Sequence, residues 1–394
     1  MIKILDEKTR YIGVDDFQVD LFEGQYIVPE GISYNSYLIL DEKVAIVDTV
    51  DGRMAQEWLP QLSQALEGRA PDYLIVHHME PDHSSLVAEL LALYPSLTVV
   101  ASAKALAMMP QFFPGLSVEG RSMAVKEGDV LSLGEHSLQF FAAPFVHWPE
   151  VMVSFDAANG VLYSADGFGK FGALSRCGFY GREDEDWTCE ARRYYFNIVG
   201  KYGAQVQALL KKASTLPIRS IRPLHGPILE DNLGFYLGLY DTWSSYGVEQ
   251  EGIFILHASI YGGTAEAAEK LAEILRAKGA PKVVVSDLLR SDYAENVEDA
   301  FRYSTLVVAA PSYDAALFPA MHAFLHKLQL KGWSRRRAAI IENGSWAPCA
   351  GRFMKEMLSQ MKEVEIIEPM VTIKSRMKDS DLPALENLAN ELLK

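Results

Sequence analysis

The spacing of apolar residues changes character along the chain. In residues 26–50, "YIVPEGISYNSYLILDEKVAIVDTV", short apolar runs alternate with the turn residues PEG, YNS and DEK, which predicts consecutive strands. The next stretch, "DGRMAQEWLPQLSQAL", has apolar residues at helical spacing. Further short apolar runs follow up to about residue 225, several of them separated by helical patterns. This mixture predicts two sheets covered by helices on the outside.

A second pattern begins near "YDTWSSYGVEQEG", residues 240–252. From there strands and helices alternate, beginning with "GIFILHAS", "GTAEAAEKLAEILRAKG" and "KVVVSDL". Regular alternation of this kind is typical of a doubly wound α/β domain with a parallel sheet. We therefore predict two α/β domains: residues 1–250 with an αββα sandwich, and residues 251–394 with the parallel sheet.

Charge and composition narrow the classes of partner and compartment. The 394 residues carry a net charge of −15 at pH 7, which argues against a nucleic acid or an anionic membrane as partner. The N-terminus "MIKILDEKTR" has no apolar signal region, and no uninterrupted apolar run reaches 18 residues. We expect a cytoplasmic protein. Cys177, Cys189 and Cys349 form no CxxC pair, which disfavours disulfides, a zinc ribbon and a four-cysteine iron centre.

Metal-competent side chains follow apolar runs in four separate segments of the first domain. These segments are "LIVHHMEPDH", "FFAAPFVHWPE", "GVLYSAD" and "IRSIRPLH". Side chains at the carboxyl ends of neighbouring strands converge, so we expect one cluster. Its members are His78, Glu80, Asp82, His83, His147, Asp166 and His225. Seven ligands exceed the needs of one tetrahedral ion and suit two ions that share a carboxylate.

The ligand types do not determine which metal binds. Carboxylates and imidazoles without a thiolate are compatible with iron, manganese and zinc. His77 precedes the cluster by one residue and is expected to face the other side of its strand. We find no partner pattern for the remaining histidines, which are His136, His257, His322 and His326.

The second domain has small and polar residues where three of its strands end. After the first strand, the loop "SIYGGTAE" leads into a helix, where backbone N–H groups can hold a phosphate. The loop has no Lys or Arg and no GxxxxGK[ST] motif, which suits the phosphate of flavin mononucleotide (FMN) better than ATP. The loops "APSYDAALFP" and "ENGSWAPCAG" each offer an aromatic residue that could line a flavin ring.

These loops resemble the phosphate loop and the two ring-binding loops of the flavodoxin family. The resemblance implies phosphate contacts from Ser259, Tyr261, Gly262, Gly263 and Thr264, although Gly263 stands near where a polar residue is usual. It implies ring contacts from Pro311, Ser312, Tyr313, Asp314, Asn343, Gly344, Ser345 and Trp346.

The first domain resembles the metallo-β-lactamase superfamily. "H-M-E-P-D-H", residues 78–83, is similar to that superfamily's His-x-His-x-Asp-His motif, with Glu80 in place of the second histidine. This substitution, followed by a flavodoxin-like domain, resembles the flavodiiron proteins over the whole chain. The resemblance implies one non-haem iron at His78, Glu80 and His147, a second at Asp82, His83 and His225, and Asp166 as the bridge. The segment "EARRYYFNIVGKY" also resembles the family, and we assign Tyr194 rather than Tyr195 to the diiron pocket.

Membership in this family would imply reduction of dioxygen to water, of nitric oxide to nitrous oxide, or both. Electrons would reach the irons through FMN from an external donor, by analogy rubredoxin or, in methanogens, a reduced deazaflavin. Family members are head-to-tail homodimers, and a tetramer is also compatible. The sequence selects neither the donor nor the substrate.

Two other functions are compatible with parts of the pattern. One is a dinuclear zinc hydrolase with an appended flavodoxin-like domain, against which Glu80 argues because a second imidazole is expected there. The other is an electron-transfer or binding module with a structural metal. The count of seven ligands argues against it, because structural sites are closed and typically mononuclear.

Overall fold

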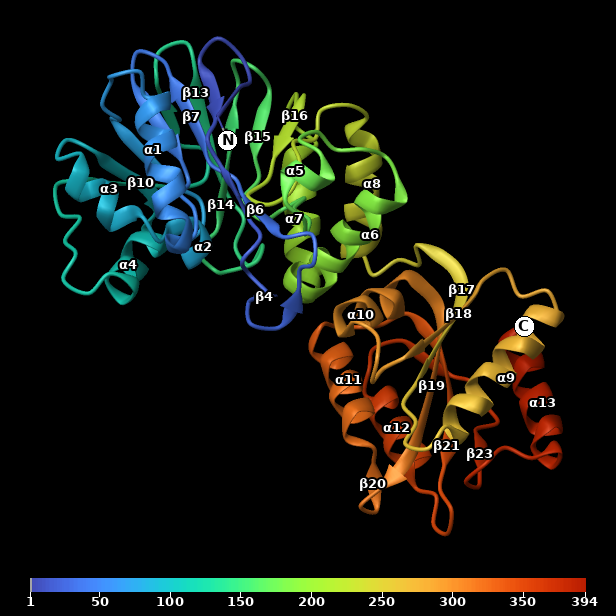
Figure 1. Ribbon diagram of the computed structural model, residues 1–394. Coiled ribbons are helices and arrows are strands. Elements are labelled where there is room, and N and C mark those ends of the chain that lie inside the picture. The colour runs from blue at the N-terminus through green and yellow to red at the C-terminus, as the bar shows by residue number, and fades with distance from the viewer. Residues whose placement is uncertain (1) are drawn as a thin grey trace. The chain divides into compact units, whose positions relative to one another are not determined.

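The computed structural model describes residues 2–394, and the chain divides into two compact units (Figure 1). Unit 1 runs to Tyr195 and resumes over Ala204–Asp241. Unit 2 consists of Phe196–Gly203 and Thr242–Lys394. The sequence predicts a single boundary near residue 250, whereas the units divide after Asp241. In addition, one short segment, residues 196–203, belongs to unit 2 although unit 1 precedes and follows it in the sequence. The sequence does not indicate that this segment belongs to unit 2, because residues 196–203 lie inside a continuous helical pattern.

The first sheet of unit 1 has seven strands in the order β1-β2-β7-β8-β9-β10-β11. Neighbours are antiparallel from β1 to β8 and parallel from β8 to β11. The strands β8 and β9 are almost continuously apolar, as expected where both faces of a sheet are covered. The strand bounds are β1 Lys3–Ile4, β2 Thr9–Tyr11, β7 Tyr37–Leu40, β8 Val44–Val47, β9 Tyr73–Val76, β10 Thr98–Ser102 and β11 Ser122–Val125.

The second sheet of unit 1 has the order β12-β13-β14-β15-β16, with only the β15–β16 pair parallel. Residues from both sheets, among them Ile39, Ile75, Phe140 and Val161, form one buried apolar core, so the two sheets face each other. The bounds are β12 Val130–Ser132, β13 Ser137–Ala142, β14 Met152–Asp156, β15 Val161–Tyr163 and β16 Ser220–Arg222.

Helices and two small antiparallel pairs accompany the two sheets in residues 2–244, of which 196–203 and 242–244 belong to unit 2 (Figure 1). The helix α6 continues as a π-helix over Tyr195–Val199 and a 3-10 turn over Gly200–Tyr202. The helices are α1 Ala55–Ala65, α2 Pro81–Ser84, α3 Val87–Leu93, α4 Ala103–Phe112, α5 Leu174–Cys177, α6 Glu185–Tyr194, α7 Gly203–Ala213 and α8 Leu233–Ser244, with a 3-10 turn at Gly52–Met54. The small pairs are β3 Val14–Asp16 with β6 Ile32–Tyr34, and β4 Leu21–Phe22 with β5 Tyr26–Ile27.

Unit 2 has a parallel sheet in the order β18-β17-β19-β21-β22, with β23 also parallel to β21 and β20 antiparallel to β19. Helices α9 and α13 cover one face, and α10, α11 and α12 cover the other (Figure 1). The strands are β17 Gln250–His257, β18 Val283–Asp287, β19 Tyr303–Tyr313, β20 Ala316–Leu317, β21 Arg336–Asn343, β22 Val364–Ile366 and β23 Val371–Ile373. The helices are α9 Gly263–Ala277, α10 Tyr293–Arg302, α11 Pro319–Leu330, α12 Ala350–Ser359 and α13 Leu382–Leu392, preceded by a 3-10 turn at Asp379–Asp381.

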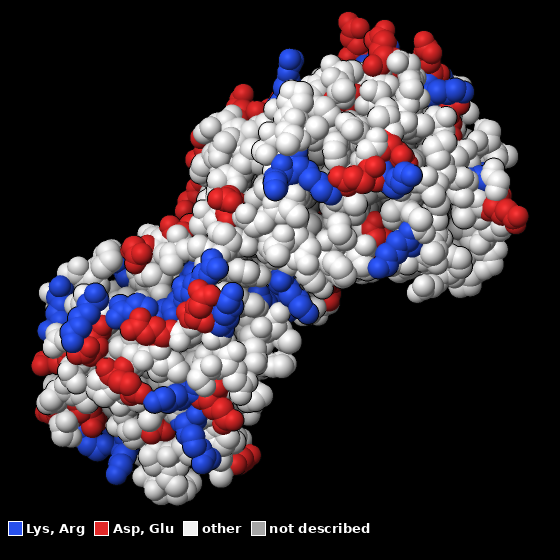
Figure 2. Space-filling view, turned by 180° about the vertical axis from the view of Figure 1, so that it is seen from behind, with Lys and Arg blue, Asp and Glu red and all other residues white. Residues whose placement is uncertain are grey.

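The predicted fold class is confirmed: a lactamase-like sandwich is followed by a flavodoxin-like parallel sheet. Among the described residues, no helix is both long enough and apolar enough to cross a membrane. On the face shown in Figure 2, basic and acidic side chains are interspersed rather than separated into large fields of one sign.

Candidate metal centre and ligand pocket

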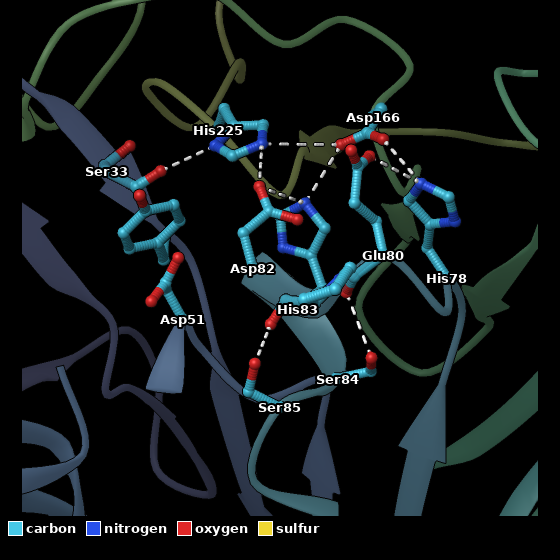
Figure 3. Close-up of polar contacts among 12 residues, drawn as sticks. Ser33, Asp51, His78, Glu80, Asp82, His83, Ser84, Ser85, Asp166 and His225 are labelled. Atoms are coloured by element: carbon cyan, nitrogen blue, oxygen red, sulfur yellow. Dashed lines mark hydrogen bonds and ion pairs between the residues drawn. The ribbon is translucent and has the colours of Figure 1, made fainter. Parts of the chain in front are cut away.

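The seven predicted metal ligands lie where strands of unit 1 end. His78 and Glu80 follow β9, while Asp82 and His83 lie in the short helix α2. His147 lies in the loop 143–151 between β13 and β14, and Asp166 and His225 follow the parallel strands β15 and β16. Figure 3 shows six of these side chains pointing toward a common centre. The structure therefore brings together residues that are up to 147 positions apart in the sequence.

The seven side chains form two groups, each able to hold one ion. His78, Glu80, His147 and Asp166 each offer a ligand atom, and these atoms lie within 4.8 Å of one another. The same limit holds for the second group, Asp82, His83 and His225. All but Glu80, which is half-buried, are buried. The two groups are those that the family resemblance assigns to two irons.

Asp166 lies between the groups and presents one carboxylate oxygen to each. Its Oδ2 is 3.2 Å from Nε2 of His78 and 3.2 Å from Nε2 of His147. Its Oδ1 is 3.3 Å from Nε2 of His83 and 3.7 Å from Nε2 of His225. A carboxylate with this placement can bridge two ions, one through each oxygen.

Several ligand atoms are buried without a hydrogen-bond partner among the described residues. They are both carboxylate oxygens of Asp82 and of Asp166, and both ring nitrogens of His83. Buried polar atoms are almost always satisfied by a protein group, water or an ion. A cluster of orphaned carboxylate oxygens and imidazole nitrogens that face one another has the donor chemistry of a cation site. These residues therefore fit a dinuclear metal centre.

Hydrogen bonds outside the cluster orient two of the ligand rings. Nδ1 of His225 is 2.8 Å from the carbonyl oxygen of Ser33, which can only accept, so Nδ1 carries the proton and Nε2 faces the cluster (Figure 3). Nδ1 of His78 is 2.7 Å from Oε1 of Glu150. Glu150 was not predicted from the sequence. Its only signal there is an acidic residue three positions after His147, in a segment that carries no further charge.

The carboxylates favour protons on the imidazoles when no cation neutralises them. Burial by itself lowers the pKa of His147, but the carboxylates of Asp166 and Glu80, 3.2 and 3.0 Å from its Nε2, outweigh burial and raise the pKa to about 9. Burial likewise opposes charge on Asp166, yet the neighbouring imidazoles hold the pKa of this carboxyl well below its usual value. A cation that binds here replaces these protons, so metal binding is coupled to proton release.

Tyr194 lies against the centre, as its assignment implies. The side chain is fully buried, its hydroxyl has no hydrogen-bond partner among the described residues, and its ring centroid is 5.6 Å from that of His225. Burial raises the pKa of Tyr194 well above its usual value, and the charges of Asp166, Asp82 and Glu80 raise it further. The neighbouring Tyr195 instead packs its ring against Tyr240, with centroids 5.1 Å apart.

Two further histidines of unit 1 are buried outside the ligand groups. The ring of His77 contacts Oδ2 of Asp48 at 2.6 Å and Oγ of Ser154 at 2.9 Å, so it faces away from the cluster, as expected. His136, for which the sequence shows no partner pattern, forms a buried pair in the structure, with its Nδ1 2.6 Å from Oδ2 of Asp156. The pairing is invisible in the sequence because the strands β13 and β14 bring the two residues together only through their register.

Unit 2 has a pocket of about 760 Å³ at the carboxyl ends of β17, β19 and β21. It is lined by every residue predicted to contact FMN except Gly262. Two large aromatic side chains at the pocket, Tyr261 and Trp346, are 98% and 92% exposed, as expected for residues that cover a flat ligand. The volume and the aromatic rim fit a flavin.

Two of the predicted ring contacts use their side chains to build the loops. Oγ of Ser312 accepts hydrogen bonds from the backbone N–H groups of Cys349 and Ala350 at the start of α12. Nδ2 of Asn343 donates to the carbonyl oxygen of Ser375, and its Oδ1 accepts from the N–H of Ser375. The pocket also has lining residues that the sequence did not indicate: Ile260, Ala315, Ala347, Cys349, Arg352, Ser375 and Arg376. Ser375 and Arg376 follow β23, a fourth strand whose end reaches the pocket.

Known proteins are similar to this chain in sequence. Residues 32–226 match the ODP family beta lactamase. A putative diflavin flavoprotein A 1 of Nostoc sp. is 33% identical over 338 residues, which cover 83% of this chain and 57% of that protein. An anaerobic nitric oxide reductase flavorubredoxin of Aliivibrio fischeri is 26% identical over 347 residues, which cover 87% of this chain and 69% of that protein. The chain thus spans little more than half the length of the Nostoc relative.

Solved structures match the whole chain. The rubredoxin oxygen:oxidoreductase of the anaerobe Desulfovibrio gigas superposes with a TM-score of 0.92 at 23% identity, covering 100% of this chain and 98% of that one. The flavodiiron protein of Giardia intestinalis gives a TM-score of 0.90 at 24% identity, covering 100% and 97%. At this level of identity the likeness shows the two-unit fold.

Proposed function

The chain belongs to the flavodiiron protein family, and from this membership we propose that it reduces dioxygen, nitric oxide or both at a pair of iron ions. The proposal includes FMN as the group that delivers electrons. It also includes an external protein as their source.

The observation that carries the proposal is the position of Asp166 between two complete ligand groups. One carboxylate that faces His78 and His147 through one oxygen, and His83 and His225 through the other, is what two neighbouring ions require. Glu80 adds an anionic donor where a hydrolase of this fold has an imidazole. Oε2 of Glu80 lies 3.2 Å from Nε2 of His78 and 3.0 Å from Nε2 of His147, within the first group.

The carboxylates of the cluster set its charge. Glu80, Asp82 and Asp166 supply three negative charges, so two divalent cations would leave a net charge of about +1. When bound, iron supplies reversible one-electron chemistry and an open position for a diatomic ligand. Because six of the seven ligand residues are buried, the protein excludes bulk water from the charged atoms, which strengthens each electrostatic interaction.

We assign Tyr194 to the catalytic site as a hydrogen-bond donor. Its hydroxyl keeps its proton, because burial and the three carboxylates raise its pKa. Having no partner among the described residues, this hydroxyl can donate to a small ligand held at the centre. A phenol that stays neutral is well suited to orient a ligand and poorly suited to act as a base.

In unit 2, the pocket residues would hold FMN. The loop 259–264 leads into α9, whose N-terminus favours a phosphate, and Tyr261, Tyr313 and Trp346 would flank the ring. Arg376 and Arg352 add positive charge to a pocket whose phosphate loop has none. When bound, FMN passes electrons singly or in pairs.

We propose a rubredoxin-type donor and a homodimer as the working assembly. The support for the donor is the naming of two similar proteins, a rubredoxin oxygen:oxidoreductase and a flavorubredoxin. This chain has only three cysteines and no CxxC pair, so it cannot itself hold a rubredoxin iron. The dimer remains a prediction that sedimentation of the purified chain would check.

The first experiment is to measure metal and flavin content after purification without added metal. About two irons and one FMN per chain are expected, and turnover with dioxygen and with nitric oxide would then be compared under a reduced donor. Two zinc ions from iron-replete cells, together with no flavin, would contradict the proposal and favour a hydrolase.

A further inference from the structure

The two ligand groups differ in the hydrogen-bond partners of their histidine Nδ1 atoms, which face away from the metal centre. Nδ1 of His78 contacts a carboxylate, Oε1 of Glu150, at 2.7 Å. Nδ1 of His225 contacts a neutral group, the carbonyl oxygen of Ser33, at 2.8 Å. Nδ1 of His83 has no hydrogen-bond partner among the described residues. Among the described residues, therefore, only the group of His78, Glu80 and His147 has a carboxylate in contact with Nδ1 of one of its imidazoles.

Glu150 is held rigidly in this role. Its side chain is fully buried, and the same Oε1 that faces His78 also accepts a hydrogen bond from the backbone N–H of Met79 at 2.9 Å. The hydroxyl of Ser102 donates to the carbonyl oxygen of Glu150 at 2.8 Å, which fixes its backbone to the end of β10. The carboxylate thus meets His78 from a backbone anchored to β10, and it also binds the residue next to His78.

An anionic partner on Nδ1 makes an imidazole a better donor through Nε2. The carboxylate fixes the tautomer and the ring orientation, and it raises the basicity of the nitrogen that faces the metal. A carbonyl fixes the tautomer too, but it brings no charge. Removing a partner of this kind typically weakens metal binding by roughly 10- to 100-fold.

We propose that Glu150 is a positioning residue that makes the His78 group the tighter of the two metal sites, an inference that rests on the dinuclear centre of the proposed function. The His78 group fills first and is emptied last. The group of Asp82, His83 and His225 is the one that exchanges its metal more readily.

The test compares the affinities of both sites in the full-length protein. The chain is dialysed without oxygen against a series of free Fe(II) concentrations, and bound iron and flavin are measured by elemental analysis and flavin release. The main variant is Glu150→Gln, whose amide oxygen can still accept from His78 and Met79, so that it removes charge while keeping size and hydrogen bonds. Glu150→Asp, which keeps the charge, is the conservative variant.

Asp156→Asn is the matched control. It neutralises another buried carboxylate of unit 1 that contacts a histidine Nδ1, here that of His136 at 2.6 Å, and His136 belongs to neither ligand group. A second background, Asp82→Ala, removes a ligand of the other group and leaves His78, Glu80 and His147 intact. One iron is expected to remain there, and it should still respond to Glu150→Gln.

The wild-type protein is expected to bind Fe(II) in two steps, first at the His78 group and then at the other group. In Glu150→Gln, the free Fe(II) needed for the first step rises about 10- to 100-fold, whereas the second step and the FMN content stay unchanged. In Glu150→Asp the first step should need much less free Fe(II) than in Glu150→Gln, because the charge is kept. In Asp156→Asn both steps should occur at the same free Fe(II) concentrations as in the wild type. Mössbauer spectra at one ⁵⁷Fe per chain should show a single ferrous environment in the wild type and two in Glu150→Gln.

The proposal would be overturned if both Fe(II)-binding steps in Glu150→Gln were the same as in the wild type, or if both were weakened equally. It would also be overturned if Asp156→Asn weakened the first Fe(II)-binding step as Glu150→Gln does. Failure of the wild-type chain to bind two irons at any free Fe(II) concentration would instead overturn the dinuclear centre on which the inference rests. The two failures are therefore distinguishable.

Discussion

Gly263, the first residue of α9, lies where a single added carbon would disturb the phosphate loop. A Cβ at this position would collide with the carbonyl oxygen of Ser375 in the loop after β23. That loop is held by Asn343, whose side chain binds both the carbonyl and the N–H of Ser375. Gly263 thus allows two loops of the pocket to approach closely, so the absence of a polar residue there has a steric reason.

We expect Gly263→Ala to weaken FMN binding by about tenfold or more, because relieving such a clash costs roughly 1–3 kcal/mol. Flavin retained after gel filtration and fluorescence titration of the stripped protein measure the loss. Gly238→Ala, in α8, is the control, because its Cβ would meet no atom within 4 Å. FMN affinity equal to wild type in Gly263→Ala would contradict this account of the pocket.

At the scale of elements, buried carboxylate–histidine pairs join the strands of unit 1. Asp48, just after β8, contacts His77, just after β9, and His77 contacts Ser154 on β14 in the second sheet. This network ties both sheets together next to His78. His136, at the turn before β13, and Asp156, on β14, form a similar pair at another place in the same unit.

The His136–Asp156 pair should make the stability of unit 1 depend on pH. The hydrogen bond to Asp156 raises the pKa of His136 above its usual 6.5. The pair's contribution is therefore complete below pH 6.5 and is lost as the pH rises through the pKa of the folded state. Asp156→Asn should lower the free energy of unfolding by roughly 1.5–3 kcal/mol at pH 6, and by less at higher pH.

Calorimetry of the wild type and of Asp156→Asn between pH 5.5 and about 9 checks this dependence. The difference between the two proteins should shrink as the pH rises. A difference that grows with pH would mean that His136 is neutral in the folded protein.

At the scale of the whole molecule, each unit carries its own site. The metal-ligand groups consist only of residues of unit 1, and the residues that line the pocket all belong to unit 2. Most of the acidic excess also lies in residues 1–241. The two cofactors are therefore expected to bind independently, even though turnover needs both.

Variants of the two sites should separate these contributions. Glu80→Ala removes a ligand of the first group and should abolish dioxygen or nitric oxide reduction while FMN stays bound. Trp346→Ala should lower FMN retention and turnover while about two irons remain per chain. Metal and flavin content, measured on the same samples as turnover, decide the matter. Loss of FMN from Glu80→Ala would contradict the assignment of one site to each unit.

The sequence by itself determined the fold class, because hydrophobic periodicity reports which faces of strands and helices are buried. The alternation after residue 250 fixes a parallel sheet, and parallel strands place their following loops at one edge. Residue type and position at strand ends also singled out the seven candidate metal ligands, because few side chains can ligate metals. Their division into the two groups that the structure brings together came from the family resemblance, to which Glu80 contributed by departing from the hydrolase motif.

Contacts between distant segments were decided only by the tertiary structure. Glu150 contacts His78, 72 residues away in the sequence, and Ser33 contacts His225, 192 residues away. Neither contact is indicated by the local sequence pattern, because each depends on how the chain folds between the two residues. The same holds for the pairing of His136 with Asp156, for Ser375 at the pocket, and for the transfer of residues 196–203 to unit 2. Periodicity shows that a residue is buried, but the partner it meets depends on how sheets and loops pack. That packing decided which histidines have an anion behind them.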